Sequence, residues 1–372
     1  MDDGARDLAE LTEALNRSTA ELTEAKFPTF SNFAGGVKAL AASDVVENAV
    51  ARAIWLSKLE TLKDGLRTAV ALEFATIPPY LTALWSIIDQ AHPIAKSIRA
   101  VVHDEMLHLS LLCNLLAGLG EEPRLTGDIV PVYPSRLPGG VHPELLLQLE
   151  GYGPSALERF MEIERPEKAI PIQGEPDQTF PDHDETIGRF YAALLANFEA
   201  LDPPLLPDRQ IAGPFTWFVM TEIAHVHEAI GLIMAQGEGA AGVPYTRYPR
   251  YLSHYYRFKS MAMSVELKWD DVAKVLIKGA ALPQPSVYTL APAPKHGHRL
   301  AAPPAVRIAS EKFEQTYSAM LRLLEASWQD SGDKSFVRAL EHMFDLAGLA
   351  RVLMQAATPD GRGHCPTFIY RP

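Results

Sequence analysis

The chain has 372 residues, of which 47% are hydrophobic and 22% are charged, and its formal net charge at pH 7 is −12. This composition is typical of a soluble globular protein with a large core, and the acidic balance without a basic cluster argues against nucleic-acid and anionic-membrane surfaces. No segment reaches the roughly 18–20 uninterrupted apolar residues of a membrane span. The acidic beginning, MDDGARDLAELTEAL, lacks the positive and apolar segments of a secretory signal, so we expect a cytoplasmic protein.

Most long segments place apolar residues at helical spacing, and few alternate with period two, so the expected fold class is all-α. Pro and Gly gather in three stretches that we expect to be long loops, 119–146, 165–183 and 282–307. The expected helices, in chain order, lie near residues 5–25, 43–90, 94–118, 184–200, 215–236, 250–262, 268–278, 308–328 and 333–356.

The second of these helices contains two adjacent prolines, Pro78 and Pro79, in the stretch ATIPPYLTALWSI. Proline removes a backbone donor and clashes with the preceding turn. We therefore predict a kink or a local unwinding at this point of the helix.

The stretch VVHDEMLHLSLL places Glu105 and His108 in an apolar helical run. Residues three apart share a helix face, so both side chains can reach one metal ion. A buried carboxylate is costly unless a partner compensates it, and metal ligation is one such compensation. A solvated helix face is the alternative interpretation of this pair.

The Glu-x-x-His pattern recurs at Glu222 and His225, again in an apolar helix. Bundles that hold a dinuclear metal centre use Glu-x-x-His from two helices and one Glu from each of two others. Glu73 is the single acid of the apolar stretch TAVALEFATIPPY in the preceding helix and meets this requirement for the first pair. For the second pair the nearest suitable acid is Glu185, whose alternative role is that of a helix-start acid.

Four further residues are candidates with alternatives. Arg189 could clamp a substrate carboxylate or pair with Glu185. Tyr80 shares a helix face with Glu73 and could line a pocket or pack in the core. Asp104 is expected to support a ligand histidine or to be solvated. His254 is more readily explained as a core histidine than as a ligand.

Carboxylates with one imidazole per ion suit iron or manganese better than zinc or copper. The chain has only two cysteines, Cys113 and Cys365, too few for a cysteine-based zinc site. Carboxylate and imidazole ligands alone favour iron or manganese but do not exclude zinc, and the cofactor we expect is two iron ions per chain, with manganese as the other option.

Several motifs together resemble the ferritin-like family named after iminophenyl-pyruvate dimer synthase, which is related to the ferritin-like part of the coupling enzymes of violacein and rebeccamycin biosynthesis. The resemblance covers residues 58–372 as one ferritin-like domain that includes the C-terminal helices, and it leaves 1–57 as an N-terminal helical extension. Relatives often carry Glu where this chain has Arg189, and many lack the pair Glu222 and His225. The motifs are LEFATIPPYLTALWSI, DEMLHLSLLCNLLAGLGEEP, YPSRLPGG, TIGRFYAAL, AQGEGA, HYYRF and GHCPTFIY.

The resemblance implies a ferritin-like four-helix bundle, metal-dependent oxidative chemistry and a setting in specialised metabolism. The metal-site motif of the family maps onto Glu73, Glu105 and His108. Together with the residue analysis, it gives the hypothesis of a non-haem di-iron oxidase or oxygenase that uses O2 or peroxide on an amino-acid-derived metabolite. The alternatives are oxidative dimerisation of an amino-acid-derived imine, and a metal-binding or scaffold protein without catalysis. The expected partner is a small molecule, with a homodimer as one option.

Overall fold

The computed structural model describes residues 45–176, 178, 180, 186–212, 218–237, 251–295, 297, 302–329 and 333–372. The helix expected over 5–25 lies outside these residues. The first described helix, α2 (Val45–Ser86), crosses residue 57. The division into 1–57 and 58–372 therefore stays a prediction.

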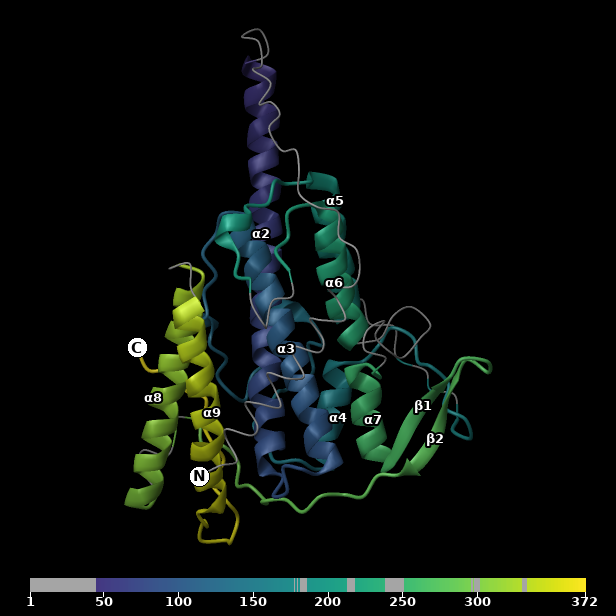
Figure 1. Ribbon diagram of the computed structural model, residues 1–372, viewed down its shortest axis with the longest axis vertical. Helices are drawn as coiled ribbons and strands as arrows, with labels where there is room; N and C mark the ends of the chain where they lie inside the picture. Colours follow the sequence, from purple (N-terminus) through teal and green to yellow (C-terminus); the bar gives the residue numbers. More distant parts are fainter. Residues whose placement is uncertain are drawn as a thin grey trace.

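Two long helices form the centre of the fold. α2 contacts α3 (Pro93–Gly118), and the short connection between them makes the pair antiparallel. Two pairs of shorter helices lie against this central pair, one towards each of its ends, and together they complete a four-helix bundle (Figure 1). The all-α prediction is confirmed, although α4 was not expected from the sequence. The shorter pairs are α5 (Ile187–Leu201) with α6 (Ile223–Gly237) and α4 (Pro154–Ile163) with α7 (His254–Met263).

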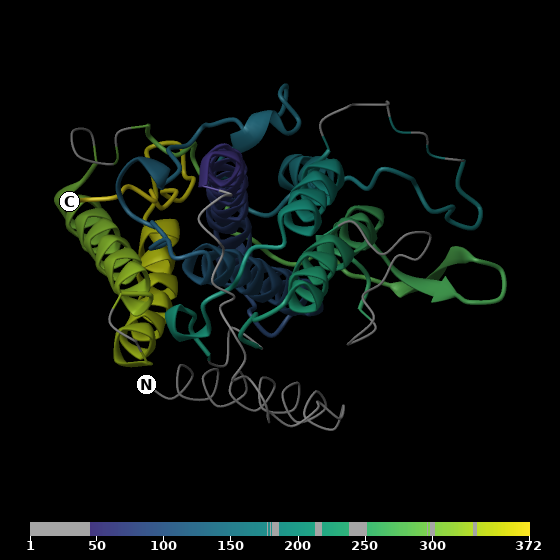
Figure 2. The same ribbon diagram turned by 90° about the horizontal axis from the view of Figure 1, so that it is seen from above.

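A hairpin of two helices, α8 (Pro304–Ser327) and α9 (Asp333–Gln355), covers the other side of the α2–α3 pair (Figures 1 and 2). The C-terminal segment is tied to α8 by the buried side chain of Glu314. This carboxylate accepts hydrogen bonds from Thr367 Oγ1 and Arg371 Nε, each at 2.7 Å. The C-terminal helices thus share one core with the bundle.

The helix expected over 268–278 is wrong, because this region forms an antiparallel hairpin of β1 (Val265–Asp270) and β2 (Val275–Ala281). Apolar residues alternate along β1, and Leu267 is buried against Leu276 in a small second core. The turn is closed by the Asp270 carboxylate, which accepts from the backbone N–H groups of residues 272 and 273. The period of two and the turn acid both indicate strands.

The expected loops contain short 3-10 helices at Gly127–Ile129 and Pro138–Gly140, and another, Pro207–Arg209, follows α5. Within the described ranges, none of the helices combines the length and the apolar character needed to cross a membrane. Both cysteines are buried thiols without a disulfide, and burial raises the pKa of each.

The local unwinding expected as one outcome at Pro78 and Pro79 does not occur, because α2 continues through both residues. A proline at position i leaves the carbonyl of residue i−4 without its helical donor. The Ala75 carbonyl, four residues before Pro79, finds a hydrogen-bond donor outside the helix, because it accepts a 2.7 Å hydrogen bond from the Tyr133 hydroxyl. A partner on a loop therefore helps the helix to pass through the prolines, as neighbouring groups do for other proline-containing helices.

Replacing Tyr133 with phenylalanine should lower the free energy of unfolding by about 1–3 kcal/mol, because the buried Ala75 carbonyl would then have no donor. Urea unfolding monitored by circular dichroism measures this change. Phenylalanine at Tyr288 is the matched control, since that hydroxyl bonds only an exposed side chain in the described structure. Equal stability of the two variants would contradict this role of Tyr133.

Candidate metal centre

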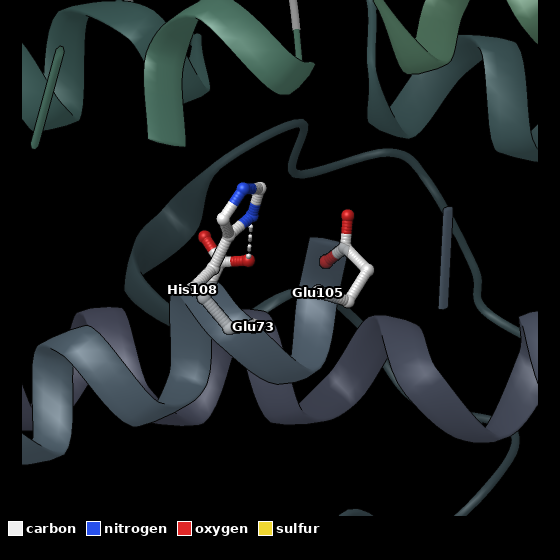
Figure 3. A group of neighbouring side chains, drawn as sticks. All are labelled: Glu73, Glu105 and His108. Carbon is white, nitrogen blue, oxygen red and sulfur yellow. Dashed lines mark hydrogen bonds and ion pairs between the residues drawn. The ribbon is translucent and has the colours of Figure 1, made fainter. Parts of the chain in front are cut away.

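The two long helices bring three predicted ligands together. Glu73 projects from α2, and Glu105 and His108 project from neighbouring turns of α3, all three buried. One ligand atom from each lies within 4.8 Å of the others, and His108 Nδ1 is 3.3 Å from Glu73 Oε2 (Figure 3). We name these residues the α2–α3 group. Two carboxylates and one imidazole at this separation could hold one metal ion.

A second group shares Glu105 with the first. Glu164 follows the last residue of α4 and His254 is the first residue of α7, and both side chains are buried. The ligand atoms of Glu105, Glu164 and His254 again lie within 4.8 Å of one another. We name these three the α4–α7 group. With one carboxylate in common, the five residues could hold two ions side by side.

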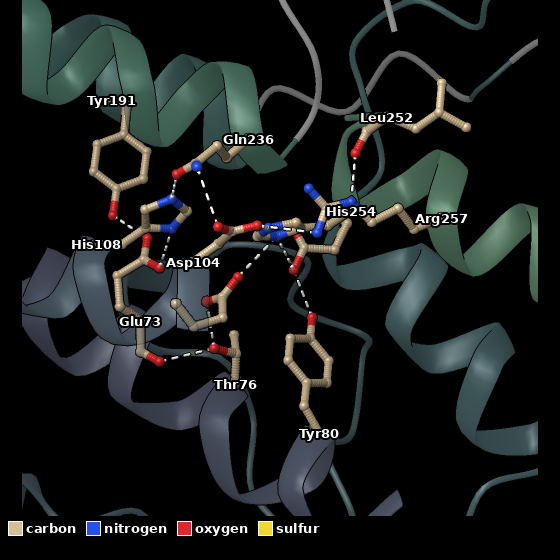
Figure 4. A network of polar contacts seen from close by, with 12 residues as sticks. Glu73, Thr76, Tyr80, Asp104, His108, Tyr191, Gln236, Leu252, His254 and Arg257 are labelled. Carbon is tan, nitrogen blue, oxygen red and sulfur yellow. Dashed lines mark hydrogen bonds and ion pairs between the residues drawn. The ribbon is translucent and has the colours of Figure 1, made fainter. Parts of the chain in front are cut away.

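The orientation of the His254 ring is set by a hydrogen bond at Nε2, on the side of the ring away from Glu105 and Glu164. Nε2 lies 3.2 Å from Asp104 Oδ2, and because a carboxylate only accepts, Nε2 carries the hydrogen. Arg257 Nη1 donates to the same Asp104 oxygen at 3.0 Å, which fixes the carboxylate in turn (Figure 4). The Nδ1 atom of His254 is therefore directed towards the acids. Asp104, expected to support a ligand histidine or to be solvated, is thus hydrogen-bonded to a histidine.

Nδ1 of His254 is a buried nitrogen without a hydrogen-bond partner among the described residues. Oxygens of Glu105 and Glu164 approach it at 2.9 and 3.5 Å, but without the alignment of a hydrogen bond. A metal ion bound by all three residues would satisfy this nitrogen, so the side chains present fit such an ion.

His108 has the same arrangement with a different partner. Its Nε2 lies 2.7 Å from the amide oxygen of Gln236 on α6, so Nε2 donates and Nδ1 is directed at Glu73. Gln236 also donates from Nε2 to Asp104 Oδ1 at 3.2 Å. The supports of the two histidines are thus connected through one amide and one carboxylate (Figure 4).

Hydroxyl groups hold the carboxylates from the other sides. The Tyr80 hydroxyl donates to Glu164 Oε1 at 2.6 Å, and the Thr76 hydroxyl donates to Glu105 Oε2 at 2.7 Å. The hydroxyl of Tyr191 on α5 donates to Glu73 Oε1. Burial and the nearby carboxylates raise the pKa of both tyrosines well above 10, so they remain donors. Tyr80, predicted near the site, is one of these donors.

The site concentrates negative charge in a buried volume. Burial, followed by the charges of Glu164 and Glu73, raises the pKa of Glu105 from 4.5 to about 8. Burial alone would lower the pKa of His254, but the charge of Glu164 and the hydrogen bond to Asp104 raise it well above 6.5. Without metal, protons on these groups balance the acids, and bound cations could replace those protons.

The second Glu-x-x-His pair lies outside this cluster, which corrects the prediction that Glu222 and His225 are ligands. Glu222 lies just before α6, which begins at Ile223, and its side chain is 66% exposed. Its Oε1 is 3.8 Å from His225 Nε2, so the two side chains face each other at the exposed start of the helix. The buried stripe of α6 is displaced from them and ends at Gln236. The apolar surroundings of the pair come from that neighbouring stripe.

Arg189, expected either to clamp a substrate carboxylate or to pair with Glu185, lies on the exposed side of α5, and the clamp stays a prediction. Its side chain is 42% exposed and pairs with Glu167, with 3.5 Å between Arg189 Nε and Glu167 Oε1. On α5 the buried stripe passes through Tyr191 instead. Glu185, the expected fourth carboxylate, lies outside the described residues.

Two ligand candidates were missed by the sequence analysis, Glu164 and His254. Glu164 follows a short helix that was not predicted, so nothing in the sequence indicated that this side chain lies at the site. His254 stands in the HYYRF motif, and its lone position in an apolar context gave no partner. An acid and a histidine that stand at the ends of two different helices have no fixed spacing in the sequence.

Comparison with known proteins agrees with this architecture. A family model described as Ferritin-like matches residues 66–263. No curated protein matches the chain. Among solved structures, a ferritin-like protein from Caulobacter vibrioides has a TM-score of 0.57 and 21% sequence identity, and the match covers 83% of this chain and 97% of that one. At this identity the structural match supports the fold alone.

Proposed function

Because this chain belongs to the ferritin-like family and gathers five buried ligand candidates, we propose that it is a metal-dependent oxidoreductase with a dinuclear centre. Glu73 and His108 would bind one ion, Glu164 and His254 the other, and Glu105 both. The observation that supports this proposal best is the shared position of Glu105 between the two groups. Oxygen ligands with one imidazole per ion favour iron, with manganese as the alternative.

Two bound iron ions would supply oxidising equivalents from O2 or peroxide for hydroxylation, desaturation or coupling of a small substrate. The protein residues have separate tasks. Asp104 and Gln236 keep a hydrogen on Nε2 of His254 and His108, so that each Nδ1 is free for the centre. The Tyr80 hydroxyl holds Glu164 in place.

The surrounding core excludes water from the proposed centre. Tyr80 packs edge-on against Phe160, with 4.6 Å between ring centroids, and also contacts Phe258. Each of these rings is fully buried. A dry site strengthens the electrostatic interactions within it and protects reactive species from side reactions. An amino-acid-derived substrate is the class that the family resemblance suggests, and it is part of the proposal.

The test is metal analysis of protein produced without a tag, loaded anaerobically with Fe(II) and then exposed to O2. We expect about two iron ions per chain and a change in the near-ultraviolet and visible absorption on oxygenation. The double variant His108→Ala and His254→Ala should lose both ions and the absorption change. Glu222→Ala with His225→Ala is the matched control, and it should keep the metal.

Equal metal content in both double variants would refute the assignment of ligands. Bound iron without any spectral response to O2 would favour a protein that only binds metal.

Replacing Asp104 with asparagine should weaken metal binding about 10–100-fold, because the hydrogen on His254 Nε2 would lose its charged acceptor. The effect should fall on the α4–α7 group, and the loss should therefore be seen for one ion of the two. Competition titration with a chromophoric chelator measures both affinities. Uniform weakening of both ions, or no change, would contradict this role of Asp104.

A further inference from the structure

A separate cavity of about 70 Å³ lies between the α2–α3 pair and the α8–α9 hairpin. Phe74 and Met106 line it, while the residues that precede them, Glu73 and Glu105, belong to the candidate metal centre. The cavity therefore lies on a different face of the central pair, towards the hairpin that Figure 1 shows on the side away from α4 and α7.

The lining of this cavity contains no charged residue. The lining residues are aliphatic, methionine and aromatic, and only Ser110 and Tyr317 among them carry hydroxyl groups. Trp328 also lines it, but the indole N–H is already used, since it donates to Asn114 Oδ1 at 2.9 Å. The hydroxyls of Ser110 and Tyr317 are the remaining side-chain polar groups of the lining residues.

Both hydroxyls are buried and lack a hydrogen-bond partner within the described part of the chain. A buried hydroxyl without a partner costs free energy, about 1–3 kcal/mol each. Serine within a helix can bond the carbonyl one turn back, and Ser110 does not. Two such groups at one apolar cavity indicate a partner that is absent from the chain itself.

We propose that this cavity binds a small neutral molecule with an apolar body and one hydroxyl or carbonyl group, which bonds Ser110 and Tyr317. A charged ligand is disfavoured, because its charge would be stripped of water without a counter-charge. Water alone is a weaker match, because apolar cavities of this kind tend to stay dry and the two hydroxyls would give a buried water only the minimum of two polar partners.

The size of the cavity sets the size of the ligand. An apolar cavity of about 150 Å³ accepts benzene, so a single ring requires this one to widen. Met106, Met320 and Met343 lie in the lining, and methionine side chains re-pack readily around a guest. A ring with one hydroxyl is thus the upper size. This site is independent of the proposed metal chemistry.

The test uses phenol and toluene, which share a ring and differ in the hydroxyl group. In protein labelled with 13C at the methionine methyls, phenol should cause saturable shifts of Met106, Met320 and Met343 among the 10 methionines. Toluene should bind about tenfold more weakly, because it leaves the buried hydroxyls unpaired. Methionine-to-leucine variants assign the three signals.

The variants Tyr317→Phe and Ser110→Ala should remove the preference for phenol over toluene. Toluene should still bind to both variants, which would show that the protein is folded and the cavity is intact. Tyr288→Phe, outside the cavity, should leave the tenfold preference unchanged. Shifts at other methionines only, or a preference for phenol that survives both hydroxyl deletions, would overturn the proposal. A high-resolution structure in which water bridges both hydroxyls and phenol does not enter would overturn it as well.

Discussion

Replacing Glu105 with glutamine should reduce the metal content from about two ions per chain to nearly none, because this carboxylate is the only residue common to both groups. The neutral amide keeps the shape of the side chain but removes the charge that both ions would share. Metal analysis after anaerobic loading with Fe(II) and gel filtration gives the number of ions directly. We expect this to be the largest effect of any single substitution at the centre.

The matched controls are Glu73→Gln and Glu164→Gln, each of which alters one group only. Each should keep about one ion per chain. Circular dichroism would confirm that all three variants remain helical. If Glu105→Gln retained as much metal as the two controls, the sharing of one carboxylate by two ions would be wrong.

The same substitution, Glu105→Gln, should increase the stability of the metal-free protein. Burial and the neighbouring acids raise the pKa of Glu105 to about 8 in the folded chain, against 4.5 for an exposed glutamate. Between these two pH values the folded state binds more protons than the unfolded state, so this group lowers stability as pH rises from about 4.5 to 8. Glutamine does not titrate, and Glu105→Gln should therefore stabilise the metal-free protein by on the order of 3 kcal/mol at pH 7.

Urea unfolding in the presence of a chelator, at pH 5 and at pH 7.5, measures this effect. The advantage of the glutamine variant should be small at the lower pH and should grow at the higher pH. Glu158→Gln on the exposed face of α4 is the control, and it should change stability by less than about 0.5 kcal/mol at both pH values. A variant less stable than the wild type at pH 7.5 would show that the carboxylate does not destabilise the metal-free fold.

The α2–α3 group could be predicted from the sequence for a physical reason. Both long helices are apolar and buried on almost every side around these residues, so an acid there has few alternatives to a compensating partner. Glu73, Glu105 and His108 satisfy this condition, and the structure brings them together. The all-α class follows from helical periodicity, whereas the four-helix bundle was expected from the family resemblance.

The α4–α7 group could not be found in this way, because its ligands stand at the ends of short helices. Glu164 and His254 have no internal repeat that relates them, and long loops separate their helices in the sequence. Glu222 and His225 carried the expected motif but lie where α6 begins, before its buried stripe. The spacing does bring these two side chains within 3.8 Å of each other, but spacing alone does not decide whether the face that carries them is buried at the site.

The two groups differ in where their ligands stand within the helices, and this difference affects how fast a bound metal ion would exchange. Glu73 and His108 are carried on the interiors of two long, continuous helices, whereas Glu164 and His254 stand where α4 ends and α7 begins. Helix ends fray more easily than helix interiors. An ion in the α4–α7 group should therefore exchange faster than an ion in the α2–α3 group. As the concentration of free metal rises, the α2–α3 group should fill first and the α4–α7 group second.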